Sequence, residues 1–129
     1  MKVLALDYGS ARTGVAVSDP TGTLARPLCV VDRAGTQAGL DRLAGLVGEE
    51  GAERVIVGLP LTLRGEHGEQ ARETERFVEA LRSRLGVSVE TFDERFTTRL
   101  AEAEDGGSAA TDARAAAHLL SGYLRWLSR

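Results

Sequence analysis

Apolar residues along the chain follow two spacings, and these predict the secondary structure. Short, nearly continuous apolar runs are typical of strands that are buried on both faces. They predict five strands, over residues 2–6, 15–17, 28–31, 54–58 and 87–92. Apolar residues three and four positions apart indicate helices with one buried face. They predict helices near residues 36–47 and 68–85, a short helix through Leu100 and Ala103, and a last helix from about Thr111.

Residues at the boundaries of these segments suit their positions. Thr36 is a candidate N-cap for the first helix, and Gly86 is a candidate end for the second. The stretch Asp19-Pro20-Thr21-Gly22 has the residue order of a type I turn. The last helix is expected to bury one apolar face, made of Ala113, Ala116, Leu120, Leu124 and Leu127.

The order of these elements predicts the fold class. Three strands joined by short turns imply an antiparallel meander at the start of the chain. The helices and strands that alternate afterwards imply parallel strands with helices packed on the sheet. We therefore expect an α/β fold with a five-stranded mixed sheet. A chain of 129 residues suits one domain, over residues 1–129.

Composition narrows the classes of function. The chain has 16 Lys and Arg against 19 Asp and Glu, a formal charge of −3. This balance argues against nucleic-acid binding through a general positive field, although a local basic groove remains compatible with it. The single cysteine, Cys29, excludes an intramolecular disulfide and a cysteine-rich metal site. Because neither a signal peptide nor a membrane-length apolar stretch is found, we expect a cytoplasmic protein with no membrane partner.

Three acidic positions fall at the ends of predicted elements. Asp7 closes the first strand, Glu94 follows the fifth strand directly after Asp93, and Asp112 lies in the first turn of the last helix. If the central strands are adjacent, these carboxylates converge on one edge of the sheet. Converging carboxylates repel each other, and a divalent cation such as Mg²⁺ or Mn²⁺ would offset that repulsion. Each acid taken alone also has an ordinary structural explanation, as a turn residue or as a first-turn helix residue.

The same residues lie in motifs that resemble the YqgF/RuvX family. The motifs are Leu4–Ala16 (LALDYGSARTGVA), Val57–Pro60 (VGLP), Asp93–Thr98 (DERFTT) and Asp112–Leu120 (DARAAAHLL). They follow the family's order over nearly the whole chain. The resemblance implies an RNase H-like fold and a metal-dependent nuclease. It also implies a connection with Holliday-junction resolution and with the processing of pre-16S ribosomal RNA.

Site residues follow from the resemblance by position. It implies a catalytic and metal-binding cluster of Asp7, Glu94 and Asp112, which would hold Mg²⁺ or Mn²⁺. Two such ions about 4 Å apart would clamp the attacking and leaving oxygens of a phosphodiester. Asp93 is a candidate fourth ligand, ranked lower because neighbouring side chains on a strand point to opposite faces.

Three arginines are candidates for binding the phosphates of the substrate. Arg12 lies in the turn after Asp7, while Arg95 and Arg99 belong to the DERFTT region and could equally be surface ion pairs. Members of the resembled family commonly carry a basic loop before the last helix. Here residues 102–111 are acidic and lack any basic residue. With fewer contacts to phosphates, the expected affinity for nucleic acid and its dependence on salt are both lower.

These observations leave several functions open. The leading interpretation is an endonuclease acting on structured nucleic acid, with branched DNA and precursor rRNA as alternative substrates. A second is a non-catalytic nucleic-acid-binding module of the same fold. A third, an ATPase-type phosphate binder, would need a second such domain to enclose a nucleotide. Symmetric cutting of a junction would need two active sites and hence a homodimer, whereas the trimming of RNA would not, so the oligomeric state stays open. The sequence also leaves open which divalent metal is bound.

Overall fold

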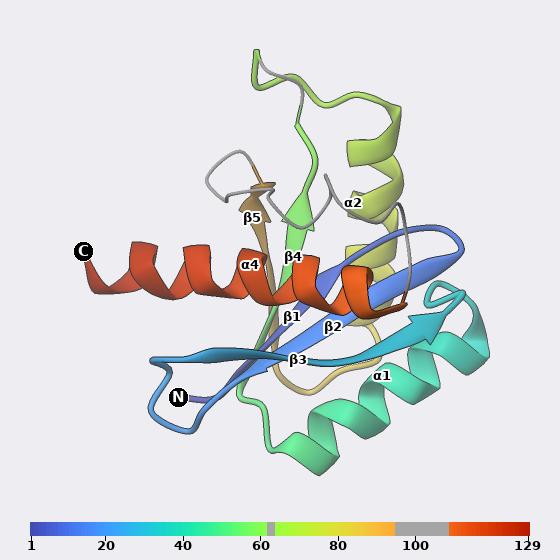
Figure 1. The fold of residues 1–129 in the computed structure, drawn as a ribbon. Helices are drawn as coiled ribbons and strands as arrows, with labels where there is room; N and C mark the ends of the chain where they lie inside the picture. Colours follow the sequence, from blue (N-terminus) through green and yellow to red (C-terminus); the bar gives the residue numbers. More distant parts are fainter. Residues whose placement is uncertain (62–63, 95–108) are drawn as a thin grey trace.

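The computed structural model describes residues 1–61, 64–94 and 109–129 (Figure 1). Its strands form one mixed sheet in the order β3-β2-β1-β4-β5. The strands are β1 (Val3–Asp7), β2 (Arg12–Ser18), β3 (Ala25–Asp32), β4 (Arg54–Leu59) and β5 (Ser88–Asp93). The first three pair antiparallel, whereas β4 runs parallel to both β1 and β5. The predicted sheet, an antiparallel meander followed by parallel strands, is confirmed.

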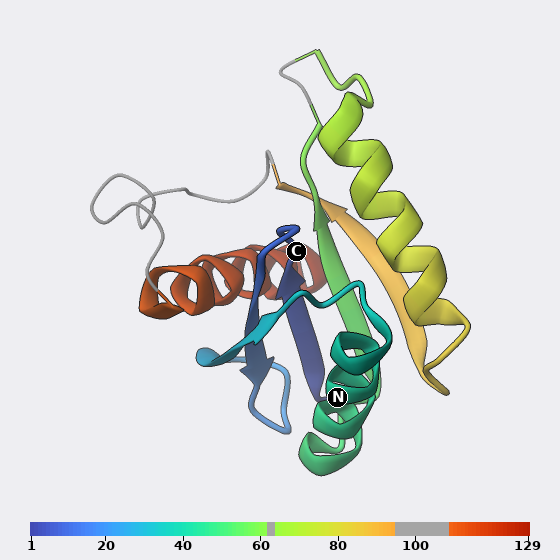
Figure 2. The same ribbon diagram turned by 90° about the vertical axis from the view of Figure 1, so that its right-hand side faces the viewer.

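Helices cover both faces of this sheet. They are α1 (Gln37–Glu50), α2 (Glu69–Arg82) and α4 (Ala109–Ser128). Figure 2 shows α1 and α2 on one face of the sheet and α4 across the other. Within the described ranges, no helix combines the length and the apolar character that crossing a membrane requires.

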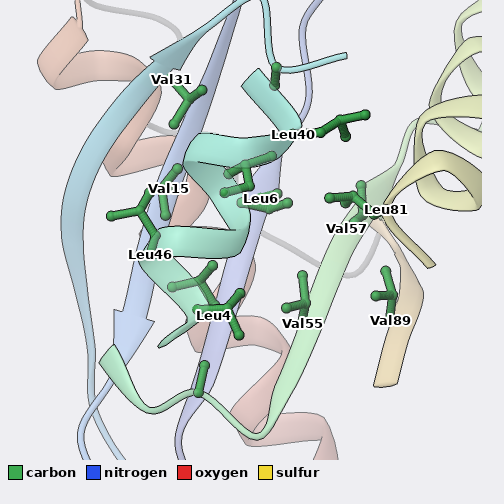
Figure 3. Close-up of a cluster of buried hydrophobic side chains, with 14 of the residues drawn as sticks. Leu4, Leu6, Val15, Val31, Leu40, Leu46, Val55, Val57, Leu81 and Val89 are labelled. Carbon is green, nitrogen blue, oxygen red and sulfur yellow. The ribbon is translucent and has the colours of Figure 1, made fainter. Parts of the chain in front are cut away.

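The covered faces explain why the strands read as continuous apolar runs. In β1, Leu4 and Leu6 belong to the cluster under α1 and α2, whereas Val3 and Ala5 belong to the cluster under α4. Figure 3 shows the first cluster, in which Leu4 and Leu6 lie among side chains of β4 and α1. Because successive strand residues face opposite sides, a sheet packed on both sides needs an apolar residue at every position.

Two of the predicted local signals are confirmed. The Thr36 hydroxyl caps α1 by accepting a hydrogen bond from the Gly39 N–H at 3.1 Å. The backbone N–H of Gly22 donates to the Asp19 carbonyl oxygen at 3.0 Å, as the turn pattern requires.

The predicted boundaries of two helices are wrong. The α2 helix ends at Arg82 with Ser83 as its C-cap, before Gly86. The apolar spacing extended the predicted helix to Leu85 because Leu85 packs against the core, although it does so from the turn after the helix. The last helix begins at Ala109, before the expected start at about Thr111, so Thr111 lies inside its first turn. Alanine's high helix propensity accounts for this earlier start.

The last helix is buried along most of its predicted apolar face but not at its C-terminal end. Ala113, Ala116, Leu120 and Leu124 are buried as predicted. Leu127, expected to be buried, is 43% exposed because the C-terminal end of α4 projects past the sheet (Figure 1). The predicted short helix through Leu100 and Ala103 lies outside the described residues.

In the turn between β2 and β3, the carboxylate of Asp19 is expected to stabilise the folded state in a way that depends on pH. The Asp19 carboxylate accepts hydrogen bonds from the Thr21 hydroxyl and from the backbone N–H groups of Leu24 and Thr23, which lower the pKa of Asp19 to about 2. Because the unfolded pKa is higher, about 3.9, these bonds stabilise the folded state above that pH. Their contribution is lost as the pH falls toward 2.

Asp19→Asn tests this contribution through urea denaturation at a series of pH values. The difference in unfolding free energy between wild type and variant should be constant above about pH 5 and shrink between about pH 4 and pH 2. A difference that stays the same over that acid range would contradict the assignment.

Candidate active site

Four predicted site residues meet in one pocket at the edge of the sheet where β1 and β4 end. Asp7 is the last residue of β1, Glu94 directly follows β5, and Asp112 lies in the first turn of α4. Arg12 opens β2 beside them. The pocket has a volume of about 200 Å³ and is lined by Asp7, Tyr8, Gly9, Arg12, Pro60, Gln70, Glu94 and Asp112.

The other predicted residues have different positions. Asp93 ends β5 and is half-buried, but it does not line the pocket that its neighbour Glu94 lines. Glu94 is buried, with only 9% of its surface exposed. Arg95 and Arg99 lie outside the described residues, as does most of the acidic segment 102–111.

Arg12 contacts a carboxylate in this structure. Its Nε lies 3.0 Å from Oδ2 of Asp112, with the two side chains 41% and 25% exposed. That Oδ2 atom is buried and accepts no hydrogen bond from the part of the chain that the structure describes. The pair is therefore a charge contact of poor hydrogen-bonding geometry. Partly exposed pairs of this kind add little stability, about 0–1 kcal/mol.

The donor set of the pocket suits a hard divalent cation. Its three carboxylates offer only oxygen ligands, which Mg²⁺ and Mn²⁺ prefer. The buried Oδ2 of Asp112 accepts no hydrogen bond within the described residues, so a cation that displaced Arg12 could take it as a ligand. Over residues 1–61, 64–94 and 109–129, however, no three Asp, Glu, His or Cys side chains are already close enough together to hold one ion. An ion that used Oδ2 of Asp112 would take the place of the Arg12 guanidinium, whose Nε lies 3.0 Å from that oxygen.

Two glycines leave the space that the acids occupy. A Cβ atom on Gly14 of β2 would lie 1.9 Å from the backbone oxygen of Asp112. A Cβ atom on Gly58 of β4 would lie 2.8 Å from Cγ of Glu94. The sequence does carry a signal for both, since glycine inside a strand often marks a close approach.

The pocket also contains residues that were not predicted to belong to it. Gln70 reaches it from the first turn of α2, and Pro60 from the loop after β4. Tyr8 stacks on Phe77 of α2, with ring centroids 4.2 Å apart and planes 20° apart. Burial, with help from the Glu73 charge, raises the pKa of Tyr8, and Arg76 opposes that shift. A lone glutamine in a polar helix turn gives no sequence signal for this placement.

The sheet order and the acidic edge together define an RNase H-like α/β fold. Solved structures agree on that fold. A Thermus thermophilus RuvC in complex with a Holliday-junction substrate superimposes with a TM-score of 0.62 at 20% identity, covering 98% of this chain and 96% of that one. The fowlpox virus resolvase in its Holliday-junction complex gives a TM-score of 0.60 at 12% identity, covering 100% of both chains.

Sequence comparisons identify the family. The family model described as "RuvX: Holliday junction resolvase" matches residues 1–126. A Chloroflexus aggregans relative is 48% identical over 100 residues, covering 78% of this chain and 70% of its own length. A Rubrobacter xylanophilus relative is 45% identical over 130 residues, covering 95% and 91%. Both carry the name "Putative pre-16S rRNA nuclease". The chain belongs to the RuvX family, which confirms the resemblance seen in its motifs.

Proposed function

We propose that this protein is a metal-dependent endonuclease that hydrolyses phosphodiester bonds in structured nucleic acid. The observation that carries the proposal is the meeting of Asp7, Glu94 and Asp112 with Arg12 in one pocket. Membership of a family described by junction resolution supports it. So do the rRNA-nuclease names of the curated relatives.

Asp7, Glu94 and Asp112 would hold Mg²⁺ or Mn²⁺, as one ion or a pair. When bound, such an ion supplies Lewis-acid chemistry toward the phosphodiester. Glu94 is held against Gly58 and buried, so it would keep a fixed position during the reaction. Asp7 is anchored by strands on both sides of β1.

Arg12 would have two states in this proposal. Without an ion, its guanidinium balances the charge of Asp112 at 3.0 Å. Released from that carboxylate, the same guanidinium can donate two hydrogen bonds to a substrate phosphate at the mouth of the pocket. Arg95 and Arg99 remain proposed as further phosphate contacts.

Branched DNA and precursor rRNA are both proposed as substrates. Paired cuts across a four-way junction need two active sites, and a homodimer would supply them. Trimming of an RNA precursor needs only one active site. The two proposals therefore differ in the oligomeric state that they require.

The test is cleavage of a four-way DNA junction and of a single-stranded RNA, assayed side by side with Mg²⁺, Mn²⁺ or a chelator, with the mass in solution measured in parallel. We expect cleavage only with a divalent ion. Paired junction cuts by a dimer would support the resolvase form, and RNA cleavage by a monomer would support the rRNA form. If neither substrate is cut with any ion, the nuclease proposal fails in favour of the non-catalytic binding module.

A further inference from the structure

A second, larger pocket adjoins the candidate active site. It has a volume of about 470 Å³ and is lined by Tyr8, Ser10, Ala11, Arg33, Gly35 and Thr36. These residues come from the loop between β1 and β2 and from the loop between β3 and α1, which lie at the same end of the sheet (Figure 1). Tyr8 lines both pockets, so the two are neighbours on either side of this residue.

Arg33 supplies an uncommitted positive charge to this second pocket. Its side chain is exposed, and within the described residues it has neither an ion pair nor a hydrogen bond. Arg12 in the first pocket differs, because its charge is balanced by Asp112. A free guanidinium at the wall of an open pocket is well suited to a phosphate group.

The backbone at Arg33 is fixed in an unusual conformation. Its φ is 46°, in the left-handed region that glycine adopts most readily. The Arg33 N–H donates to the Ala11 carbonyl at 2.9 Å, and the Arg33 carbonyl accepts from the Thr36 hydroxyl at 2.8 Å. These bonds join the two loops and hold the base of the Arg33 side chain in place, so the pocket wall is preformed.

Tyr8 supplies a polar group between the two pockets. Its ring is held by stacking on Phe77, while its hydroxyl faces Gly35, where an added Cβ would lie 3.6 Å from the hydroxyl oxygen. A phenolic hydroxyl in this position can donate a hydrogen bond to a ligand oxygen.

We propose that this second pocket binds the nucleotide next to the scissile phosphodiester, with Arg33 contacting its phosphate and the Tyr8 hydroxyl donating to a phosphate or sugar oxygen. The inference rests on the proposed function, because it takes the ligand to be the nucleic-acid substrate of the first pocket. Beyond the proposed function, it assigns a binding site to the nucleotide that neighbours the cleaved bond in the nucleic-acid chain.

Binding of a fluorescently labelled four-way junction and of a labelled single-stranded RNA tests the proposal, using anisotropy with Ca²⁺ in place of Mg²⁺ over a series of salt concentrations. Arg33→Gly is the main variant, since glycine accepts the backbone conformation and removes only the side chain. We expect its Kd to rise about tenfold, as for a lost charged hydrogen bond. Its slope of log K against log salt should flatten by about 0.7–0.9.

Two further variants separate the contact from general effects. Tyr8→Phe keeps the ring on Phe77 and loses only the hydroxyl, so its Kd should rise about threefold. Arg125→Ala removes the same charge from the last turn of α4, where Arg125 lines a different pocket together with the β2–β3 turn. Its Kd and salt slope should match the wild type. The melting temperature of Arg33→Gly should be no lower than that of the wild type.

The results distinguish this proposal from the nuclease proposal. If Arg33→Gly binds with the wild-type Kd and salt slope, or loses no more affinity than Arg125→Ala, the second pocket is not a nucleotide subsite. The nuclease proposal would then stand on cleavage alone. If Arg33→Gly loses affinity while the wild type cuts neither substrate with Mg²⁺ or Mn²⁺, the second pocket still binds a nucleotide, but as part of a non-catalytic binding module, and the nuclease proposal fails.

Discussion

Asp7→Asn is expected to reduce cleavage by at least ~100-fold while leaving the fold intact. Changes to residues that only support metal ligands already cost 10–100-fold in affinity or activity, and a direct ligand should cost no less. Asparagine keeps the size and shape of Asp7 but removes the negative charge. The residue ends β1, whose other positions are held by β2 and β4, so the strand has no reason to shift.

Two measurements make this result specific. Mn²⁺ should raise the melting temperature of the wild type, because a ligand of the folded state stabilises it, and should raise that of Asp7→Asn much less. Asp41→Asn is the matched control, since it makes the same chemical change on the exposed face of α1. It should leave both cleavage and the Mn²⁺ effect unchanged. Equal cleavage by Asp7→Asn and wild type would remove Asp7 from the proposed cluster.

The sheet could be predicted because both of its faces are buried, and this burial requires a pattern of apolar residues that is visible in the sequence. The strands Val3–Asp7 and Arg54–Leu59 carry apolar residues at nearly every position, which only a sheet covered on both faces requires. Capping by Thr36 was predictable as well, since the hydrogen bond is made within one turn. Helix ends were less predictable, because Leu85 contacts the core without being helical.

The site was predictable only in part. Asp7, Glu94 and Asp112 could be placed at one edge, because each ends or begins an element of known direction. The Arg12–Asp112 contact depends on how α4 lies across β2, which no local pattern records. The same holds for the left-handed backbone at Arg33, since an exposed arginine in a loop carries no sign of its conformation.

Gly14→Ala is expected to have the largest effect on stability and also to impair the site. Gly14 lies in β2 opposite Asp7, and its added Cβ would meet backbone atoms of α4: the Asp112 oxygen at 1.9 Å and the Ala113 nitrogen at 3.1 Å. A side-chain rotation cannot relieve contacts with backbone, so the first turn of α4 must move and take Asp112 with it. We expect a loss of about 3 kcal/mol in unfolding free energy, at the upper end for overpacked cores.

Gly45→Ala is the matched control, and the double variant separates displacement of Asp112 from unfolding. Gly45 lies in α1 with nothing within 4 Å of an added Cβ, so alanine there should raise the unfolding free energy by up to about 1 kcal/mol. Urea denaturation measures both effects. Cleavage by Gly14→Ala, corrected for the folded fraction, should remain low even when Gly45→Ala restores part of the stability. Wild-type cleavage in that double variant would mean that Asp112 keeps its place, or that its place does not matter for the reaction.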